Sequence, residues 1–228
     1  TGYVGLVTGV CFSNTGNQVT CLDVDARTIE KLKQGICPIY EPGLTELVRD
    51  GLRQGHLRFS TDHAEAAHVE FVFLCLPTPP AEDGRADLTY LLDAARTLSP
   101  HLKADTVVIN KSTVPVGSCA RVQRELGRQD VFVVSNPEFL REGHAVQDCL
   151  QPDRLVIGSD DEAAAIRVFS LYRGVVPPFI NIIGVLFGLT LAFIANDTWS
   201  AHDRAMNAVY KESDSLRSIS ALAGKLPE

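Results

Sequence analysis

The sequence predicts an α/β fold, a doubly wound parallel sheet with helices on both faces. Strand-length apolar runs alternate with helix-length stretches over residues 3–172, which is the pattern of successive β-α-β units. The runs 69–76 and 106–110 are apolar almost throughout, as strands buried on both faces of a parallel sheet are. Polar segments rich in proline or glycine follow three of the predicted strands.

The individual elements follow from this alternation in chain order. Residues 3–14 come directly after a glycine turn and are predicted as a helix, and residues 18–23 are predicted as a strand that ends in an acidic residue. The other predicted helices are 27–34, 44–54, 88–98, 116–126 and 162–172, and the other predicted strands are 57–60, 69–76, 106–110, 131–134 and 154–158. Ligands of such sheets bind outside the carboxyl ends of the strands. We therefore expect the segments 78–84, 111–117 and 135–143 to converge on one edge.

The alternation stops near residue 174, so we expect two regions, 1–173 and 174–228. The second is predicted to be mostly helical and to be an incomplete or degenerate central region. Residues 179–195 are nearly all apolar, but the run is short for a spanning helix, which needs about 20 apolar residues. Glycines also interrupt it. A buried strand or core helix is favoured there, and no membrane partner is expected.

Composition narrows the class of protein. The formal net charge of −7 argues against a general nucleic-acid surface, which needs a basic patch. The cysteines show no C-x-x-C pair and no zinc spacing, so no metal site is expected. We interpret them as reduced thiols of a cytoplasmic protein. They are Cys11, Cys21, Cys37, Cys75, Cys119 and Cys149.

The first five residues indicate a dinucleotide site. Thr1-Gly2-Tyr3-Val4-Gly5 matches the last five positions of a G-x-G-x-x-G turn, and no strand precedes it in this sequence. Asp23 lies 18 residues beyond Gly5, where that fingerprint places the carboxylate that binds the ribose hydroxyls. A carboxylate there repels a 2′-phosphate, so NAD is predicted rather than NADP. The alternative is a plain glycine turn with a solvated aspartate.

Six motifs in a fixed order resemble the UDP-glucose/GDP-mannose dehydrogenase family over residues 1–173. They are 1–6 (TGYVGL), 38–44 (PIYEPGL), 77–80 (PTPP), 111–118 (KSTVPVGS), 135–143 (SNPEFLREG) and 152–158 (PDRLVIG). The resemblance implies a Rossmann-like NAD-binding domain, here without its first strand. It implies a cytoplasmic enzyme of polysaccharide biosynthesis that oxidises the C6 hydroxyl of a nucleotide sugar, UDP-glucose above all, to the carboxylate of UDP-glucuronate. It leaves a homodimer open.

The resemblance also implies roles for particular residues. The implied cofactor residues are Gly2, Tyr3, Val4, Gly5, Asp23, Thr78 and Thr113. Glu138 is the implied catalytic residue, which handles water, and the implied substrate residues are Phe139, Leu140, Arg141 and Glu142. Each has a plainer interpretation. Glu138 could cap a local turn, the two threonines could be ordinary turn residues, Arg141 and Arg154 could be solvated, and Glu41 could only begin a helix.

The sequence departs from the family pattern after residue 173. The family's nucleophilic cysteine and its Lys-Asp pair are not found, because no cysteine follows Cys149 and the contexts of Lys211 and Lys225 do not match. Neither Cys119 nor Cys149 is assigned as the nucleophile. Residues 205–226 and 182–190 resemble later family segments weakly. Three functions stay open: the dehydrogenase, an inactive NAD-binding paralogue acting as a binding module, and a β-hydroxyacid dehydrogenase, against which the 41–44 and 136–143 motifs argue.

Overall fold

The computed structural model describes residues 1–82 and 84–173, which all fall within one compact unit of the chain. The expectations for residues 174–228, including the apolar run 179–195 and the two weak resemblances, lie outside the described residues. Among the residues described, no helix is both long and apolar enough to span a membrane.

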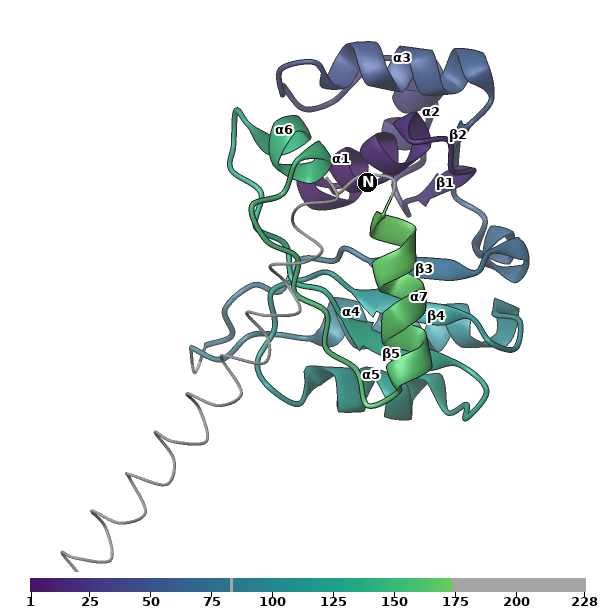
Figure 1. Ribbon diagram of the computed structural model, residues 1–228, viewed down its shortest axis with the longest axis vertical. Helices are drawn as coiled ribbons and strands as arrows, with labels where there is room; N and C mark the ends of the chain where they lie inside the picture. Colours follow the sequence, from purple (N-terminus) through teal and green to yellow (C-terminus); the bar gives the residue numbers. More distant parts are fainter. Residues whose placement is uncertain (83, 174–228) are drawn as a thin grey trace, which may run out of the picture. The chain divides into compact units, whose positions relative to one another are not determined.

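The strands form two parallel sheets (Figure 1). One pairs β1 (Val19–Leu22) with β2 (Leu57–Ser60), and the other has the order β3 (Phe71–Leu74), β4 (Val107–Asn110) and β5 (Phe132–Ser135). The usual Rossmann strand order is 3-2-1-4-5-6. Both sheets are parallel, so the predicted parallel architecture is confirmed, and the described strands are divided between two sheets.

Seven α-helices connect and cover these strands within the described part of the chain, close to the predicted bounds. They are α1 (Tyr3–Asn14), α2 (Ala26–Lys33), α3 (Leu44–Gln54), α4 (Thr89–Leu98), α5 (Ser118–Leu126), α6 (Ala145–Leu150) and α7 (Glu162–Tyr172). Of these, α6 was not expected, and neither were the 3-10 turns η1 (His63–His68) and η2 (Ser99–His101).

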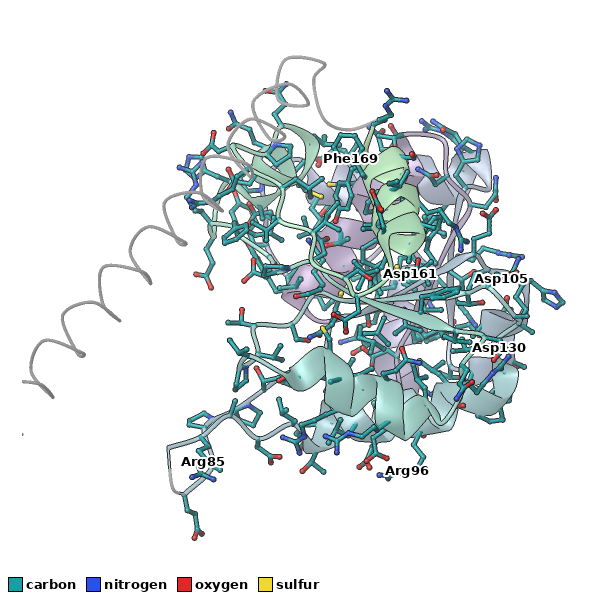
Figure 2. All side chains as sticks on the ribbon, turned by 60° about the horizontal axis from the view of Figure 1, so that its bottom comes forward. Arg85, Arg96, Asp105, Asp130, Asp161 and Phe169 are labelled. Carbon is teal, nitrogen blue, oxygen red and sulfur yellow. The ribbon has the colours of Figure 1, made fainter. Side chains whose placement is uncertain are left out.

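Local sequence explains where the helices begin. Asp25 and Asp161 cap α2 and α7 by accepting hydrogen bonds from Arg27 N (2.9 Å) and Ala164 N (2.7 Å), and Figure 2 shows Asp161 at the start of α7. Such caps satisfy backbone N–H groups that have no partner within the helix. These two caps fix where α2 and α7 begin, close to the positions that the sequence predicted.

Residues 154–158 do not form the predicted strand. The segment pairs with β5 at a single antiparallel bridge, where Ser135 and Gly158 exchange backbone hydrogen bonds of 2.7 and 2.9 Å. The carbonyl of Val156 accepts instead from the side chain of Asn136 at 2.8 Å. The pairing with β5 does not extend beyond this bridge, because the Asn136 side-chain amide donates to the Val156 carbonyl in place of a main-chain N–H group.

The core lies on both faces of the β3–β4–β5 sheet. Val108 packs among residues of α4 and α5, whereas its neighbours Val107 and Ile109 pack with α7 and with Phe12 of α1. The ring centroids of Phe12 and Tyr172 are 5.0 Å apart, with an angle of 67° between the ring planes, which is an edge-to-face contact. This alternation is the period of a strand buried on both faces, as predicted for this run.

Helix α1 lies against both sheets, and two glycines allow this. A Cβ at Gly9 would lie 2.6 Å from Cys21 Sγ on β1, and one at Gly5 would lie 3.2 Å from Cys75 Cβ just after β3. The first distance is too short for two non-bonded atoms. The close approach fixes the N-terminus of α1 at the carboxyl ends of β1 and β3, which is where the predicted ligand edge lies.

Candidate cofactor and substrate site

The loops after β3 and β4 meet as predicted at the carboxyl edge of the sheet. The Thr78 hydroxyl donates to the Thr113 carbonyl (2.9 Å), and Ser112 Oγ accepts from Leu76 N (2.9 Å). Asn136 N, in the loop after β5, donates to the Asn110 carbonyl (2.9 Å). The segments that follow three separate strands are thus joined by short hydrogen bonds into one surface.

The N-terminus of α1 opens at this edge without a side-chain cap. Gly2 precedes the helix in an extended conformation, no side chain caps it, and no acidic residue lies in the first turn. A Cβ at Gly2 would meet no atom within 4 Å. Uncapped N–H groups and the positive end of the helix dipole form an anion site. The turn therefore fits a pyrophosphate.

Asp23 follows β1 and lies beside this turn. Its Oδ2 accepts from the Thr1 hydroxyl (2.5 Å) and from the terminal ammonium of Thr1 (2.6 Å), and its Oδ1 accepts from Asp25 N (2.9 Å). Burial alone would raise the pKa of Asp23, but the hydrogen bonds from Asp25 N, the ammonium and the hydroxyl lower it to about 2. The carboxylate is therefore ionised at neutral pH, as a ribose-binding acceptor needs to be.

Glu41 is the residue that the sequence reasoning missed. It is only 4 % exposed and does not cap α3, which begins after Gly43. Its Oε2 accepts from the Tyr3 hydroxyl (2.7 Å) and from Gly143 N (3.0 Å), and its Oε1 accepts from Ala145 N (2.6 Å). One buried carboxylate therefore ties the start of α1 to the segment before α6. Its sequence signals were its position between Tyr40 and Pro42, in a rigid turn, and its place in the 38–44 motif.

The 138–142 segment is held in place on both sides. Glu138 Oε2 accepts from Leu140 N (2.7 Å), so its carboxylate closes a local turn, as the plainer interpretation expected. Arg141 forms an ion pair with Asp148 through bonds of 3.0 and 2.6 Å. Phe139 is 44 % exposed, with the Arg154 guanidinium 4.7 Å from its ring centre, and Leu140 packs on the core with α1.

A pocket of about 480 Å³ lies beside this segment. Its lining includes Phe139, Leu140, Arg141, Lys111 and Cys149. Lys111 is 7 % exposed and donates to Asn136 Oδ1 and to Tyr172 Oη, both at 3.3 Å. Burial lowers the pKa of Lys111, while the charges of Cys149, Cys75 and Glu138 oppose that effect. No group of three or more His, Cys, Asp or Glu side chains arranged for a metal ion occurs in residues 1–82 and 84–173.

Two family models match this sequence. The NAD-binding domain of the UDP-glucose/GDP-mannose dehydrogenase family matches residues 1–176, and a Bestrophin-like domain matches residues 157–228. A UDP-glucose 6-dehydrogenase of Bacillus subtilis is 45% identical over 179 residues, which are 76% of this chain and 41% of that protein. The chain thus spans about 41% of the length of that curated relative.

Solved structures agree with the sequence relatives. A UDP-glucose dehydrogenase from Pyrobaculum islandicum superposes with a TM-score of 0.71 at 42% identity, covering 76% of this chain and 42% of that one. A ternary complex of GDP-mannose dehydrogenase from Pseudomonas aeruginosa gives a TM-score of 0.72 at 30% identity, covering 85% of this chain and 49% of that one.

Proposed function

The chain belongs to the UDP-glucose/GDP-mannose dehydrogenase family, and on this basis we propose that it is the cofactor-binding part of an NAD-dependent nucleotide-sugar 6-dehydrogenase. The proposed reaction oxidises the C6 hydroxyl of UDP-glucose to the carboxylate of UDP-glucuronate. The observation that carries this proposal is the uncapped N-terminus of α1 with the ionised Asp23 beside it, at the edge where three loops meet.

The proposed cofactor residues bind different parts of NAD. The backbone N–H groups of the turn Gly2, Tyr3, Val4 and Gly5 face the pyrophosphate, and Asp23 accepts from the ribose hydroxyls. Since the pKa of Asp23 is about 2, its negative charge disfavours a 2′-phosphate at every pH near neutrality. Tyr3 contributes its backbone only, because its hydroxyl is bound to Glu41.

Thr78 and Thr113 form the wall on which the nicotinamide half would lie. Their mutual hydrogen bond fixes the loops after β3 and β4. NAD, when bound, would supply the hydride acceptor, and the loops of Thr78 and Thr113 would hold its nicotinamide ring in place. Their contribution is orientation, which fixes the distance between the reacting atoms.

The proposed substrate residues are Phe139, Leu140, Arg141 and Glu142, with Glu138 as general base. In this structure Glu138 is bound to Leu140 N, so its carboxylate is preoriented within its own loop. A carboxylate near the reacting carbon can take a proton from water once the site is closed to solvent. We propose residues 1–173 as the NAD-binding domain. We also propose that the protein is a homodimer and that it is located in the cytoplasm.

A second candidate is an inactive paralogue that binds NAD as a module. It differs from the dehydrogenase in lacking the thiol that the proposed reaction needs to capture the aldehyde. Both candidates share the cofactor site.

An absorbance assay for NADH distinguishes the dehydrogenase from the binding module. It uses the purified chain with NAD and UDP-glucose. Two NADH per sugar would support the dehydrogenase. No NADH, with NAD binding intact by calorimetry, would support the module. A folded chain that does not bind NAD would contradict both.

A further inference from the structure

Lys111 is a buried cation without a charged partner. Its backbone N–H donates to the Leu74 carbonyl (3.0 Å), which fixes the residue directly after β4, and the residue is only 7 % exposed. Its ammonium donates to Asn136 Oδ1 and to Tyr172 Oη, which are both neutral groups and both 3.3 Å away. No carboxylate forms an ion pair with it within residues 1–82 and 84–173. A buried ammonium without an anion is costly, so an anion beside it would stabilise the protein.

The two acceptors of Lys111 are held in place by other hydrogen bonds. The Tyr172 hydroxyl donates to Asn136 Oδ1 at 2.5 Å, and Asn136 Nδ2 donates to the Val156 carbonyl at 2.8 Å. The Asn136 amide therefore keeps its oxygen towards Lys111. A lysine ammonium has three N–H donors, and Lys111 has only two acceptors in the described part of the chain. One N–H group is therefore left for a further acceptor.

The pocket of about 480 Å³ lies at the ammonium end of Lys111. Its lining includes Lys111, Tyr172, whose hydroxyl contacts the ammonium, and Pro137, which directly follows Asn136. The backbone of Lys111, by contrast, is bonded to β3 through Leu74. Pockets that bind small molecules measure about 300–1,000 Å³, so this pocket is large enough for a ligand that accepts from Lys111.

The charged lining of the pocket favours an anion. Arg141 and Asp148 neutralise each other through hydrogen bonds of 3.0 and 2.6 Å. Arg154 and Asp153 are both exposed, and Arg154 forms no ion pair among the residues that the structure describes. These two arginines and Lys111 are three cations against two carboxylates in the lining, an excess of one positive charge. Lys111 supplies that charge in the buried part of the pocket.

We propose that this pocket binds a phosphate group, with the buried Lys111 ammonium and the exposed Arg154 guanidinium as its two cations. A phosphate group has several strong acceptor oxygens and a charge approaching −2 near neutral pH, whereas a carboxylate carries a single charge. Lysine and arginine are the side chains that bind phosphate in proteins. The two cations that have no carboxylate bonded to them therefore match a phosphate better than a carboxylate.

Two sources of phosphate share this chemistry, free inorganic phosphate and the diphosphate of a nucleotide sugar. Phe139, Leu140 and Arg141 line the pocket and are among the proposed substrate residues, so the second source rests on the proposed function. The first source does not. The α1 turn is a separate site, because none of residues 1–5 lines this pocket.

The test is calorimetric titration of the full chain with sodium phosphate at constant ionic strength, with and without NAD. We expect phosphate to bind in both cases, because NAD would occupy the α1 turn and leave the pocket free. No binding at millimolar phosphate, or binding that NAD abolishes, would overturn the proposal. A chain that binds phosphate but not NAD would contradict the proposed function and leave the phosphate site supported.

The same titration in the presence of UDP-glucose distinguishes the two sources. Loss of the phosphate signal would identify the diphosphate of the nucleotide sugar as the group that the pocket accepts. An unchanged phosphate affinity would identify a site for free phosphate. Each result supports the pocket, provided that the phosphate affinity depends on Lys111.

Lys111→Met tests that dependence. Phosphate binding should weaken at least about tenfold, because a charge-assisted hydrogen bond is lost. Stability should not fall, since an unpaired buried charge is removed and the hydrogen bond between Tyr172 and Asn136 remains. Lys103→Met, on an exposed lysine before β4, is the matched control and should change the affinity less than about twofold. Equal phosphate affinity in the wild type and Lys111→Met would overturn the proposal.

Arg154→Gln keeps the proposal testable if Lys111→Met does not fold. Arg154 is exposed, so its replacement should leave the urea midpoint unchanged and weaken phosphate binding severalfold. An unchanged phosphate affinity in Arg154→Gln would contradict a site with two cations.

Discussion

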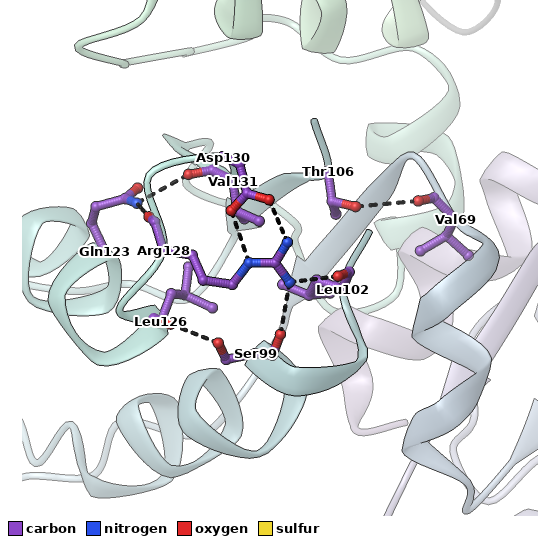
Figure 3. Close-up of polar contacts among 9 residues, drawn as sticks. All are labelled: Val69, Ser99, Leu102, Thr106, Gln123, Leu126, Arg128, Asp130 and Val131. Atoms are coloured by element: carbon purple, nitrogen blue, oxygen red, sulfur yellow. Dashed lines mark hydrogen bonds and ion pairs between the residues drawn. The ribbon is translucent and has the colours of Figure 1, made fainter. Parts of the chain in front are cut away.

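The two ends of the β3–β4–β5 sheet are both tied by polar side chains, but in different ways. At the amino ends of the strands the Arg128 guanidinium donates to both oxygens of Asp130 (2.9 and 2.6 Å) and to the carbonyls of Ser99 (3.1 Å) and Leu102 (2.5 Å) (Figure 3). At the carboxyl ends, the buried Glu41 accepts from residues up to 104 positions away in the sequence.

This difference separates a structural end from a functional one. The Arg128 contacts satisfy carbonyls of the neighbouring turns, and no unpaired helix terminus opens among them. At the carboxyl end the polar groups fix loops around an uncapped helix N-terminus and an ionised Asp23. Open α/β sheets bind ligands at this second end. Variants at the two ends should therefore differ in their effect on NAD binding, whatever they do to stability.

Removing the Glu41 carboxylate should have the largest effect on stability. Glu41→Ala leaves the N–H groups of Gly143 and Ala145 without their acceptor. Removing a buried charged acceptor from such hydrogen bonds costs about 3 kcal/mol of stability. The free energy of unfolding, measured by urea denaturation, should fall by that order, and NAD affinity should fall with it. Glu142→Ala, on the exposed neighbouring carboxylate, is the control and should leave stability nearly unchanged.

Two serines allow a matched comparison of the ends. Ser112→Ala removes the acceptor of Leu76 N and should cost about 1–2 kcal/mol, with weaker NAD binding because the loops of Thr78 and Thr113 loosen. Ser99→Ala removes the donor to the Leu126 carbonyl (2.6 Å) and should cost about 1 kcal/mol with NAD affinity unchanged. Equal losses of NAD affinity in both variants would remove the distinction between the two ends.

Arg128→Ala tests the structural end directly. Stability should fall by less than in Glu41→Ala, because Arg128 is partly exposed and water can replace its bonds to the Ser99 and Leu102 carbonyls. The NAD dissociation constant should stay at the wild-type value. Thermal unfolding and calorimetry on the same sample give both quantities. A large loss of NAD affinity in Arg128→Ala would mean that a group at the amino ends of the strands contributes to NAD binding, which contradicts the distinction between the two ends.

The pH dependence of stability should show the smallest difference. The pKa of Asp23 in the folded chain is about 2, below the ordinary value of about 3.9. The folded state therefore favours the ionised form, so the stabilisation is complete above about pH 4 and is lost as the pH falls towards 2. Asp23→Asn should lack this part of the acid dependence. The difference between the two urea midpoints should be constant from pH 5 to 8.

Periodicity and motif order predicted most of the fold. Strand and helix bounds agree to within one or two residues because buried strands such as β4 and capped helices such as α7 depend on local sequence. The family, the parallel architecture and the NAD cofactor are confirmed by the family match and the related structures. The individual site residues stay predictions.

The errors share a physical cause. The predicted strand 154–158 failed because Asn136, about twenty residues away, takes the carbonyl of Val156. Helix α6 has only 6 residues, too few for a periodic pattern to appear. Glu41 and Lys111 act through partners that are distant in the sequence, and neither spacing nor composition encodes such contacts. Lys111 did carry a signal, since it follows directly on the apolar run of β4.

The central claim is that the cofactor binds at the carboxyl end of the sheet through the α1 turn and Asp23. Calorimetric titration of the wild-type chain with NAD and NADP, repeated for Asp23→Asn and Arg128→Ala, tests it most directly. We expect the wild type and Arg128→Ala to bind NAD equally and to prefer it over NADP, and Asp23→Asn to bind NAD more weakly and to lose most of that preference. Unchanged affinity and preference in Asp23→Asn would contradict the account.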